Sequence, residues 1–82
     1  SLIDSDLSRF TNSLSILRSS NIAIINAIEI SADTVSNNFL RKQIKNISNR
    51  VAEGESLASS LEKIPVIPSL VTQMVENGER SG

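Results

Sequence analysis

Apolar residues recur at steps of three and four positions along most of this 82-residue chain. The clearest set falls within an arc of about 60° on a helix that turns by about 100° per residue. It consists of Leu40, Ile44, Ile47 and Val51. The Ile-rich segment after residue 21 could be read as a strand, but its apolar positions do not alternate. The spacing therefore predicts an all-α fold.

Caps and turn residues divide the pattern into helices. The first helix is expected to begin near Asp4 or Ser5 and to end around Ser19 to Asn21, because Asn tolerates a left-handed conformation. Its buried stripe is predicted to be Leu7, Phe10, Leu14 and Leu17. A short second helix is expected to bury Ile24, Ile25 and Ile28, with Ala23, Ala27 and Ala32 allowing close approach.

Three further helices are predicted in the second half of the chain. Ser36 is the expected N-cap of the third and Gly54 its end, while Ser56 caps a short fourth helix with Leu57 and Leu61 inside. Pro68 is expected at the first position of the fifth helix, which should end at Gly78. Its predicted core stripe is Leu70, Val71, Met74 and Val75.

Five amphipathic helices joined by short turns predict a small antiparallel helical bundle. No low-complexity linker divides the chain, so residues 1–82 are expected to form a single domain. The longest apolar run is only 22–25, and Asp4 and Asp6 interrupt any signal-peptide core, so the chain as given is expected to be soluble. It lacks an initiator Met and reads as a piece of a larger protein.

Composition excludes most catalytic and metal chemistry. The chain has no Cys and no His, so thiolate nucleophiles, imidazole ligands and Ser-His-Asp triads are absent. Its net charge of −1 and lack of Tyr and Trp also disfavour binding to nucleic acid. Glu76, Glu79, Asp4 and Asp6 lack the spacing of a calcium loop, and Glu76 is instead expected to pair with Arg80. We therefore predict no enzyme activity, no cofactor and no metal.

Half of the basic residues lie in one stretch of ten positions within the predicted third helix. They are Arg41, Lys42, Lys45 and Arg50. One interpretation is a docking patch for an acidic partner surface or for lipid head groups. The simpler interpretation is that Arg41, Lys42 and Lys45 form the solvated back of the helix, opposite its apolar stripe.

Three segments together carry a resemblance to a known family. Residues 14–28 resemble the helix-turn-helix opening of the type II secretion system F domain. Val51-Ala-Glu-Gly54-Glu-Ser56-Leu57 is similar to that family's V-x-x-G-x-S-L motif. Residues 67–82 resemble its ending, in which an apolar residue and Pro68 begin a helix that closes on G-E-x-S-G. The positions that match or replace motif residues are Asn21, Gly54, Ser56, Leu57, Pro68, Met74, Gly78, Glu79, Ser81 and Gly82.

The resemblance implies a non-catalytic scaffold. Members of the family are polytopic inner-membrane platform proteins of type II secretion and type IV pilus assembly, with two copies of this domain at the cytoplasmic face, and this chain looks more like the second copy. Their implied partners are the secretion or pilus ATPase machinery, other inner-membrane components and, for some, further copies of themselves. Arg41, Lys42, Lys45 and Glu79 are the candidate partner contacts, with Glu79 alternatively a structural anchor at a helix corner.

The chain departs from the family pattern in three ways, one of which is Ile67 in place of the usual Phe before Pro68. Asn21 and Ala23 stand where the family usually has Gly and Pro, although Asn can occupy the left-handed position of the turn. The family domain also continues with a further long helix after the G-E-x-S-G motif, which is missing here. Without that helix, part of the stripe on the fifth helix is expected to be exposed and to drive self-association.

Two other classes of protein remain open from the residues alone. An acyl carrier presents an Asp-Ser pair at the start of a helix in mid-chain, whereas Asp4-Ser5 stands at the beginning here. A helix-turn-helix DNA-binding domain needs base-reading residues on one helix, and Arg41, Gln43, Asn46 and Asn49 would supply them. The net charge argues against the second alternative.

Overall fold

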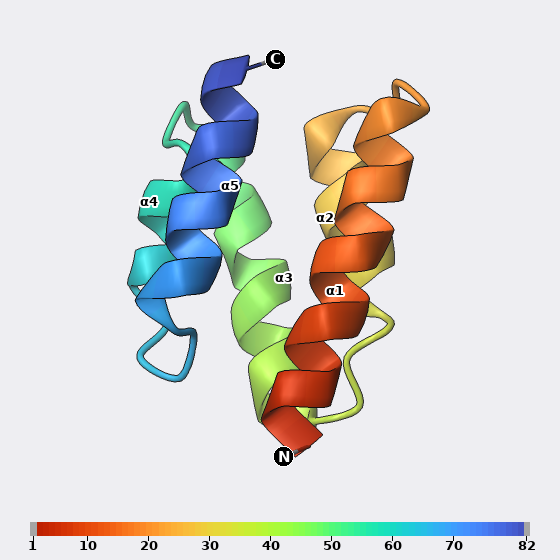
Figure 1. Cartoon of the computed structure of the whole chain (residues 1–82), viewed down its shortest axis with the longest axis vertical. Coiled ribbons are helices and arrows are strands. Elements are labelled where there is room, and N and C mark those ends of the chain that lie inside the picture. Colours follow the sequence, from red (N-terminus) through yellow and green to blue (C-terminus); the bar gives the residue numbers. More distant parts are fainter. Residues whose placement is uncertain (1, 82) are drawn as a thin grey trace.

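The computed structural model describes residues 2–81 as five helices without strands. The helices are α1 (Leu2–Ser19), α2 (Ile24–Ala32), α3 (Asn38–Ala52), α4 (Leu57–Glu62) and α5 (Ser69–Ser81). Consecutive helices run in opposite directions and pack on one another in chain order (Figure 1). The predicted all-α antiparallel bundle is therefore confirmed. Ser1 and Gly82, the last residue of the G-E-x-S-G motif, lie outside the described residues.

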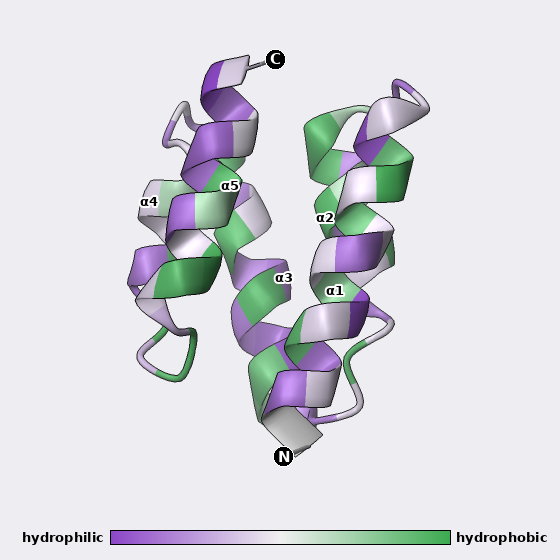
Figure 2. Cartoon of the chain, viewed as in Figure 1, coloured by the Kyte–Doolittle hydropathy of each residue, from purple (hydrophilic) through white to green (hydrophobic). Residues whose placement is uncertain are grey.

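One hydrophobic core connects the five helices. Its fully buried members include Phe10 of α1, Ile28 of α2, Leu40 and Ile44 of α3, and Leu61 of α4. Hydropathy colouring shows apolar bands recurring between polar ones along the helices (Figure 2). The loop residues Val35, Ile64 and Ile67 join the same cluster.

Two helices end as the sequence predicts. Asn21 has φ 64°, and the N–H of Ile22 donates to the carbonyl of Leu17 at 3.0 Å. Gly54 has φ 106°, and the N–H of Glu55 donates to the carbonyl of Arg50 at 3.0 Å. A left-handed residue lets the next N–H reach a carbonyl of the last helical turn, which ends the helix with its backbone satisfied.

Several predicted boundaries are wrong by a few residues. Helix α1 begins at Leu2 rather than at Asp4 or Ser5. The N-cap of α3 is Asn37, whose Oδ1 accepts from the N–H of Leu40 at 2.8 Å, because the hydroxyl of Ser36 bonds to another helix. Pro68 precedes α5 instead of occupying its first position, and its carbonyl accepts from the N–H of Val71.

The largest correction concerns α5. Gly78 does not end this helix, which continues to Ser81, so Glu79 is a helical residue of α5. Two predicted core residues are also outside the core: Leu70 is 66% and Met74 is 61% exposed. Val71 and Val75 are only partly buried against the core, since nothing packs on the far side of α5 among the described residues.

The stripe predicted for α2 is partly correct. Ile28, Ala27 and Ala32 are fully buried, whereas Ile24 and Ile25 are half-buried and Ala23 is exposed. Ala23 occupies the N-cap position, where its side chain points away from the packed face of the helix. The buried part of this short helix is therefore its second half, with Ala27, Ile28, Ser31 and Ala32 inside.

Candidate interaction site

The basic residues of α3 differ in how firmly the fold holds them. The Arg41 guanidinium donates to the carbonyl of Val35 at 2.9 Å and also bonds the side chain of Asn38, so it is committed to the turn before α3. Lys45 forms an exposed ion pair with Asp33, with Nζ 2.7 Å from Oδ1. Lys42 is exposed and has no hydrogen bond or ion pair with any other residue in the range 2–81. Of the three predicted contacts, only Lys42 is therefore wholly available.

Glu79 connects the last two helices. Its Oε2 accepts from the backbone N–H of Leu57 at 2.8 Å, and its Oε1 accepts from the N–H of Ala58 at 3.0 Å. The hydroxyl of Ser56 accepts from the N–H of Ser59 at 3.1 Å. Together these two side chains satisfy the free N–H groups that begin α4, where the positive end of the helix dipole favours a carboxylate.

This corner gives the Glu79 carboxylate of α5 two hydrogen-bond partners. The N–H groups of Leu57 and Ala58 accommodate its charge. The second and third motifs of the sequence thus meet here, through Ser56, Leu57 and Glu79. Asn21 and Pro68 lie at other turns and take no part in this corner.

Glu55 organises the loop before α4. Its carboxylate accepts from Lys63 at 2.6 Å and from the hydroxyl of Ser59 at 2.9 Å, and it lies 3.6 Å from the Arg50 guanidinium. The hydrogen bond from Lys63 and that from Ser59 lower the pKa of Glu55. Arg50 and Lys63 are therefore partly neutralised by a residue of their own chain.

A buried carboxylate ties α1 to the start of α3, a role that the sequence pattern did not predict. Asp6 is fully buried, and it accepts from the backbone N–H groups of Ser36 at 2.9 Å and Asn37 at 3.0 Å. The Ser36 hydroxyl and the Arg9 guanidinium complete its shell. The Ser36 backbone hydrogen bond, with those from Asn37, the Ser36 hydroxyl and Arg9, outweighs burial and lowers the pKa of Asp6 from 3.8 to about 2. The sequence does carry a signal for this burial, since Asp6 stands four residues before Phe10 and therefore on the apolar side of the helix. A buried acid requires hydrogen-bond partners.

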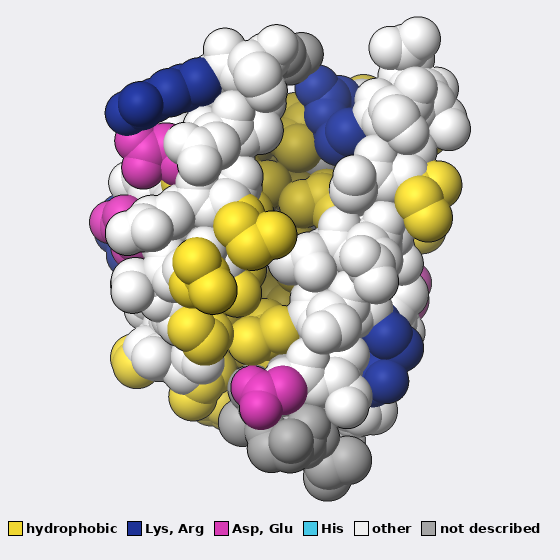
Figure 3. Space-filling view, viewed as in Figure 1, with side chains coloured by type: hydrophobic (Ala, Val, Ile, Leu, Met, Phe, Trp, Pro, Cys, Tyr) yellow, Lys and Arg dark blue, Asp and Glu magenta, His cyan; other side chains and the backbone are white. Residues whose placement is uncertain are grey.

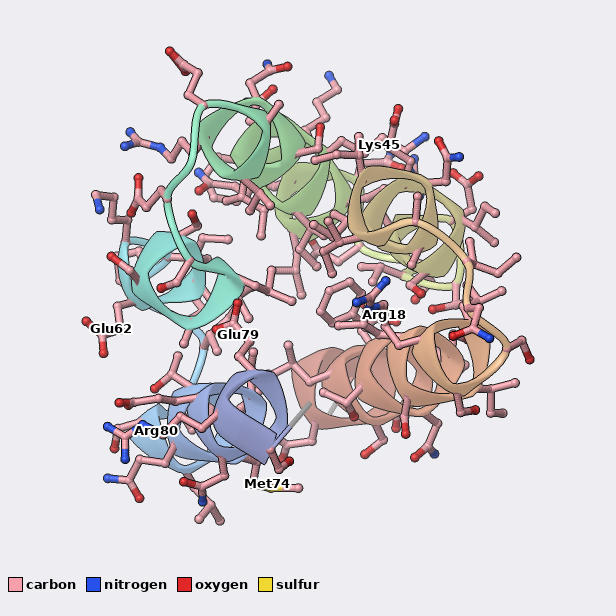
Figure 4. The ribbon with its side chains drawn as sticks, turned by 90° about the horizontal axis from the view of Figure 1, so that it is seen from above. Arg18, Lys45, Glu62, Met74, Glu79 and Arg80 are labelled. Carbon is pink, nitrogen blue, oxygen red and sulfur yellow. The ribbon has the colours of Figure 1, made fainter. Side chains whose placement is uncertain are left out.

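A groove of about 580 Å³ separates α1 from α5. No Cα atom of α1 lies within 8 Å of one of α5 among the described residues, and the space-filling view shows a hollow with an apolar floor between them (Figure 3). Its apolar walls include Leu14, Ile24, Val51, Leu57, Met74 and Val75. Arg18 also lines the groove and is directed toward the centre of the ring of helices when the molecule is seen from above (Figure 4).

The described part of the chain offers no metal centre. No group of three or more acidic side chains in residues 2–81 is arranged to hold a cation. Glu76 instead pairs with Arg80 at 2.6 Å, as the spacing predicted. Across the same residues, none of the helices combines the length and the hydropathy that crossing a membrane requires.

Comparison with known proteins identifies the family. The family model described as "Type II secretion system (T2SS), protein F" matches residues 10–82. The chain belongs to this family. The predicted resemblance is thereby confirmed, over most of the same residues that suggested it.

Curated relatives carry names from both secretion and pilus assembly. The type II secretion system protein F of Pseudomonas aeruginosa is 35% identical over 94% of this chain and 19% of its own length. That of Vibrio cholerae is 35% identical over 90% of the chain and 18% of its own length. The type IV pilus assembly protein PilC of Myxococcus xanthus is 34% identical over 93% of the chain and 18% of its own length. The chain spans about a fifth of these relatives, and no solved structure matches it significantly.

Proposed function

We propose that this chain is a non-catalytic interaction domain of an inner-membrane platform protein, and that it helps couple a cytoplasmic ATPase to the assembly of a pseudopilus or pilus. The identity of 35% with a type II secretion system protein F over 94% of the chain carries this proposal. The absence of Cys and His from the sequence is consistent with a role in binding rather than in chemistry. The domain would lie at the cytoplasmic face of the membrane in which its parent protein is embedded.

Within this function, the two sets of candidate residues take different roles. Lys42, with Lys45 beside it, is the proposed contact for the ATPase machinery or another assembly component, since it is exposed and unpaired among residues 2–81. Glu79 is the proposed structural anchor, because both of its carboxylate oxygens accept from the start of α4. We propose a structural role for Arg41 as well, since its guanidinium donates a hydrogen bond to the carbonyl of Val35.

Charge reversal at Lys42 in the parent protein tests the proposal. Lys42→Glu is expected to reduce secretion or pilus assembly in the host cell while the abundance of the parent protein stays constant. Lys42→Arg should retain function, and Asn12→Glu, which adds a carboxylate to an exposed position of α1, serves as the control. Normal assembly with Lys42→Glu would count against a contact at this position.

A further inference from the structure

The outward face of α3 differs in charge from every other helix surface in residues 2–81. Helix α3 contains four of the eight basic residues of the chain and none of its nine acidic residues. Each of the other four helices contains at least one acid. We define the α3 face as five of the exposed residues of this helix: Phe39, Lys42, Lys45, Asn46 and Asn49.

Phe39 gives this face an apolar contact point. It is one of only two aromatic residues in the chain, and 68% of it is exposed, whereas Phe10 is fully buried in the core. Exposed aromatic side chains are enriched at the centres of protein interfaces, because they bury a large area with little loss of conformational freedom. Phe39 stands one turn before Lys42 on the same side of α3.

The cations beside Phe39 are available to a carboxylate from outside the chain. Lys42 has no partner in residues 2–81, and the pair between Lys45 and Asp33 is exposed, so Lys45 can exchange partners at little energetic cost. Lys42 and Lys45 lie about 4.5 Å and about 9 Å along the helix axis from Phe39, at about 1.5 Å per residue. An apolar residue with an acid one turn away therefore matches Phe39 and Lys42.

The narrow width of the α3 face favours a helix over a membrane as its binding partner. This surface is one helix wide, and the exposed carboxylate of Asp33 lies beside it, 2.7 Å from Lys45. A flat anionic bilayer that covers Lys42 would also cover Asp33 and would be repelled by it, whereas a single helix can place a carboxylate at Lys42 and an uncharged side chain beside Asp33.

We propose that the α3 face docks an acidic amphipathic helix of another protein, with an apolar side chain covering Phe39 and a carboxylate facing Lys42. This inference rests on the proposed function and names the chemistry of the partner. The contact is small and depends on opposite charges, so its affinity is expected to fall as the salt concentration rises.

Site-specific photo-cross-linking in the parent protein tests the inference. A photoreactive amino acid at position 39 is expected to cross-link, in the host cell, to a segment of another protein that has apolar and acidic residues at helical spacing. The same amino acid at position 16 is the matched control, since Ile16 is 65% exposed but lies on α1. Cross-links from position 39 to lipid, or to a second copy of this chain, would overturn the proposal.

Binding measurements on the 82-residue chain supply the second test. The probe is a synthetic helical peptide with Leu and Glu repeated at helical spacing, followed by fluorescence anisotropy at low salt. Phe39→Ala is expected to weaken binding about tenfold, and Lys42→Glu about fivefold. Lys42→Arg and Ile16→Ala should leave the affinity unchanged, and circular dichroism confirms that each variant is folded.

The outcomes separate the inference from the proposed function. Peptide binding that is absent, or insensitive to both Phe39→Ala and Lys42→Glu, overturns the inference whatever the host assay shows. Tighter binding to phosphatidylglycerol vesicles that both substitutions abolish also overturns it, in favour of a membrane contact. If peptide binding and cross-linking behave as expected while Lys42→Glu leaves secretion and pilus assembly intact, the chemistry of the face stands and the proposed role of Lys42 in assembly fails.

Discussion

Gly54 and Gly78 stand in opposite backbone environments, although both are motif glycines. Gly54 has φ 106°, a region that side chains with a Cβ rarely adopt, and it ends α3. Gly78 lies inside α5, where an added Cβ would meet no atom within 4 Å. The sequence pattern predicted that both glycines end helices, and the structure shows this for Gly54 but not for Gly78.

Substitution by Ala separates the two glycines. Gly78→Ala is expected to stabilise the chain by about 0.5–1 kcal/mol, because Ala is the better residue in a helix interior. Gly54→Ala is expected to destabilise it by about 1–2 kcal/mol, because it forces Ala into the left-handed region. The free energy of unfolding from urea titration measures both. A destabilising Gly78→Ala would show that the helix requires a glycine for close packing.

Glu79 is a second residue whose role depends on a distant partner. Replacing it with Ala removes the cap from two N–H groups of α4 and is expected to reduce the free energy of unfolding by about 1 kcal/mol. Glu62→Ala, an exposed acid at the other end of α4, is the matched control and should change stability by less than about 0.5 kcal/mol. Equal effects of the two substitutions would contradict the capping role.

At the scale of elements, the junction between α1 and α3 depends on one ionised carboxylate. Asp6 accepts hydrogen bonds from Ser36 and Asn37, so it caps the turn that leads into α3 from a helix thirty residues earlier. The position of α3 relative to α1 is thus fixed by a polar contact as well as by the core. Sequence periodicity predicted both helices but not this connection, since no local pattern specifies which backbone groups a buried acid will meet.

The junction predicts a decrease in stability in acid. The pKa of Asp6 is lowered in the folded chain from 3.8 to about 2, so the folded state binds fewer protons than the unfolded state between these values. Its stabilising contribution is therefore present above the unfolded pKa and is lost as pH falls through about 2. Urea midpoints should show Asp6→Asn less stable than wild type at pH 7, with the difference shrinking below about pH 4. A difference that is constant with pH would exclude ionisation as the cause.

At the scale of the whole molecule, the groove between α1 and α5 leaves apolar surface exposed. Leu70 and Met74 protrude from α5, and the groove beside them is lined with aliphatic side chains. Apolar patches of several hundred Å² rarely remain uncovered in water. We therefore expect this chain, taken by itself, to self-associate through α5.

Sedimentation checks this expectation. Wild-type chain is expected to show concentration-dependent association in the micromolar range, and Met74→Glu should shift it toward monomer by placing a charge in the contact. Phe39→Ala, which lies on α3 away from the groove, should leave association unchanged. A wild-type chain that stays monomeric at the same concentrations would contradict the expectation.

The sequence by itself determined the helices, most of the core and the ends at Asn21 and Gly54, because three- and four-residue spacing and left-handed residues act within a single turn of backbone. Tertiary structure alone decided the burial of Asp6 and the capping role of Glu79. These features join groups more than twenty residues apart, and the free energy of such a contact depends on which distant backbone groups the fold brings within reach.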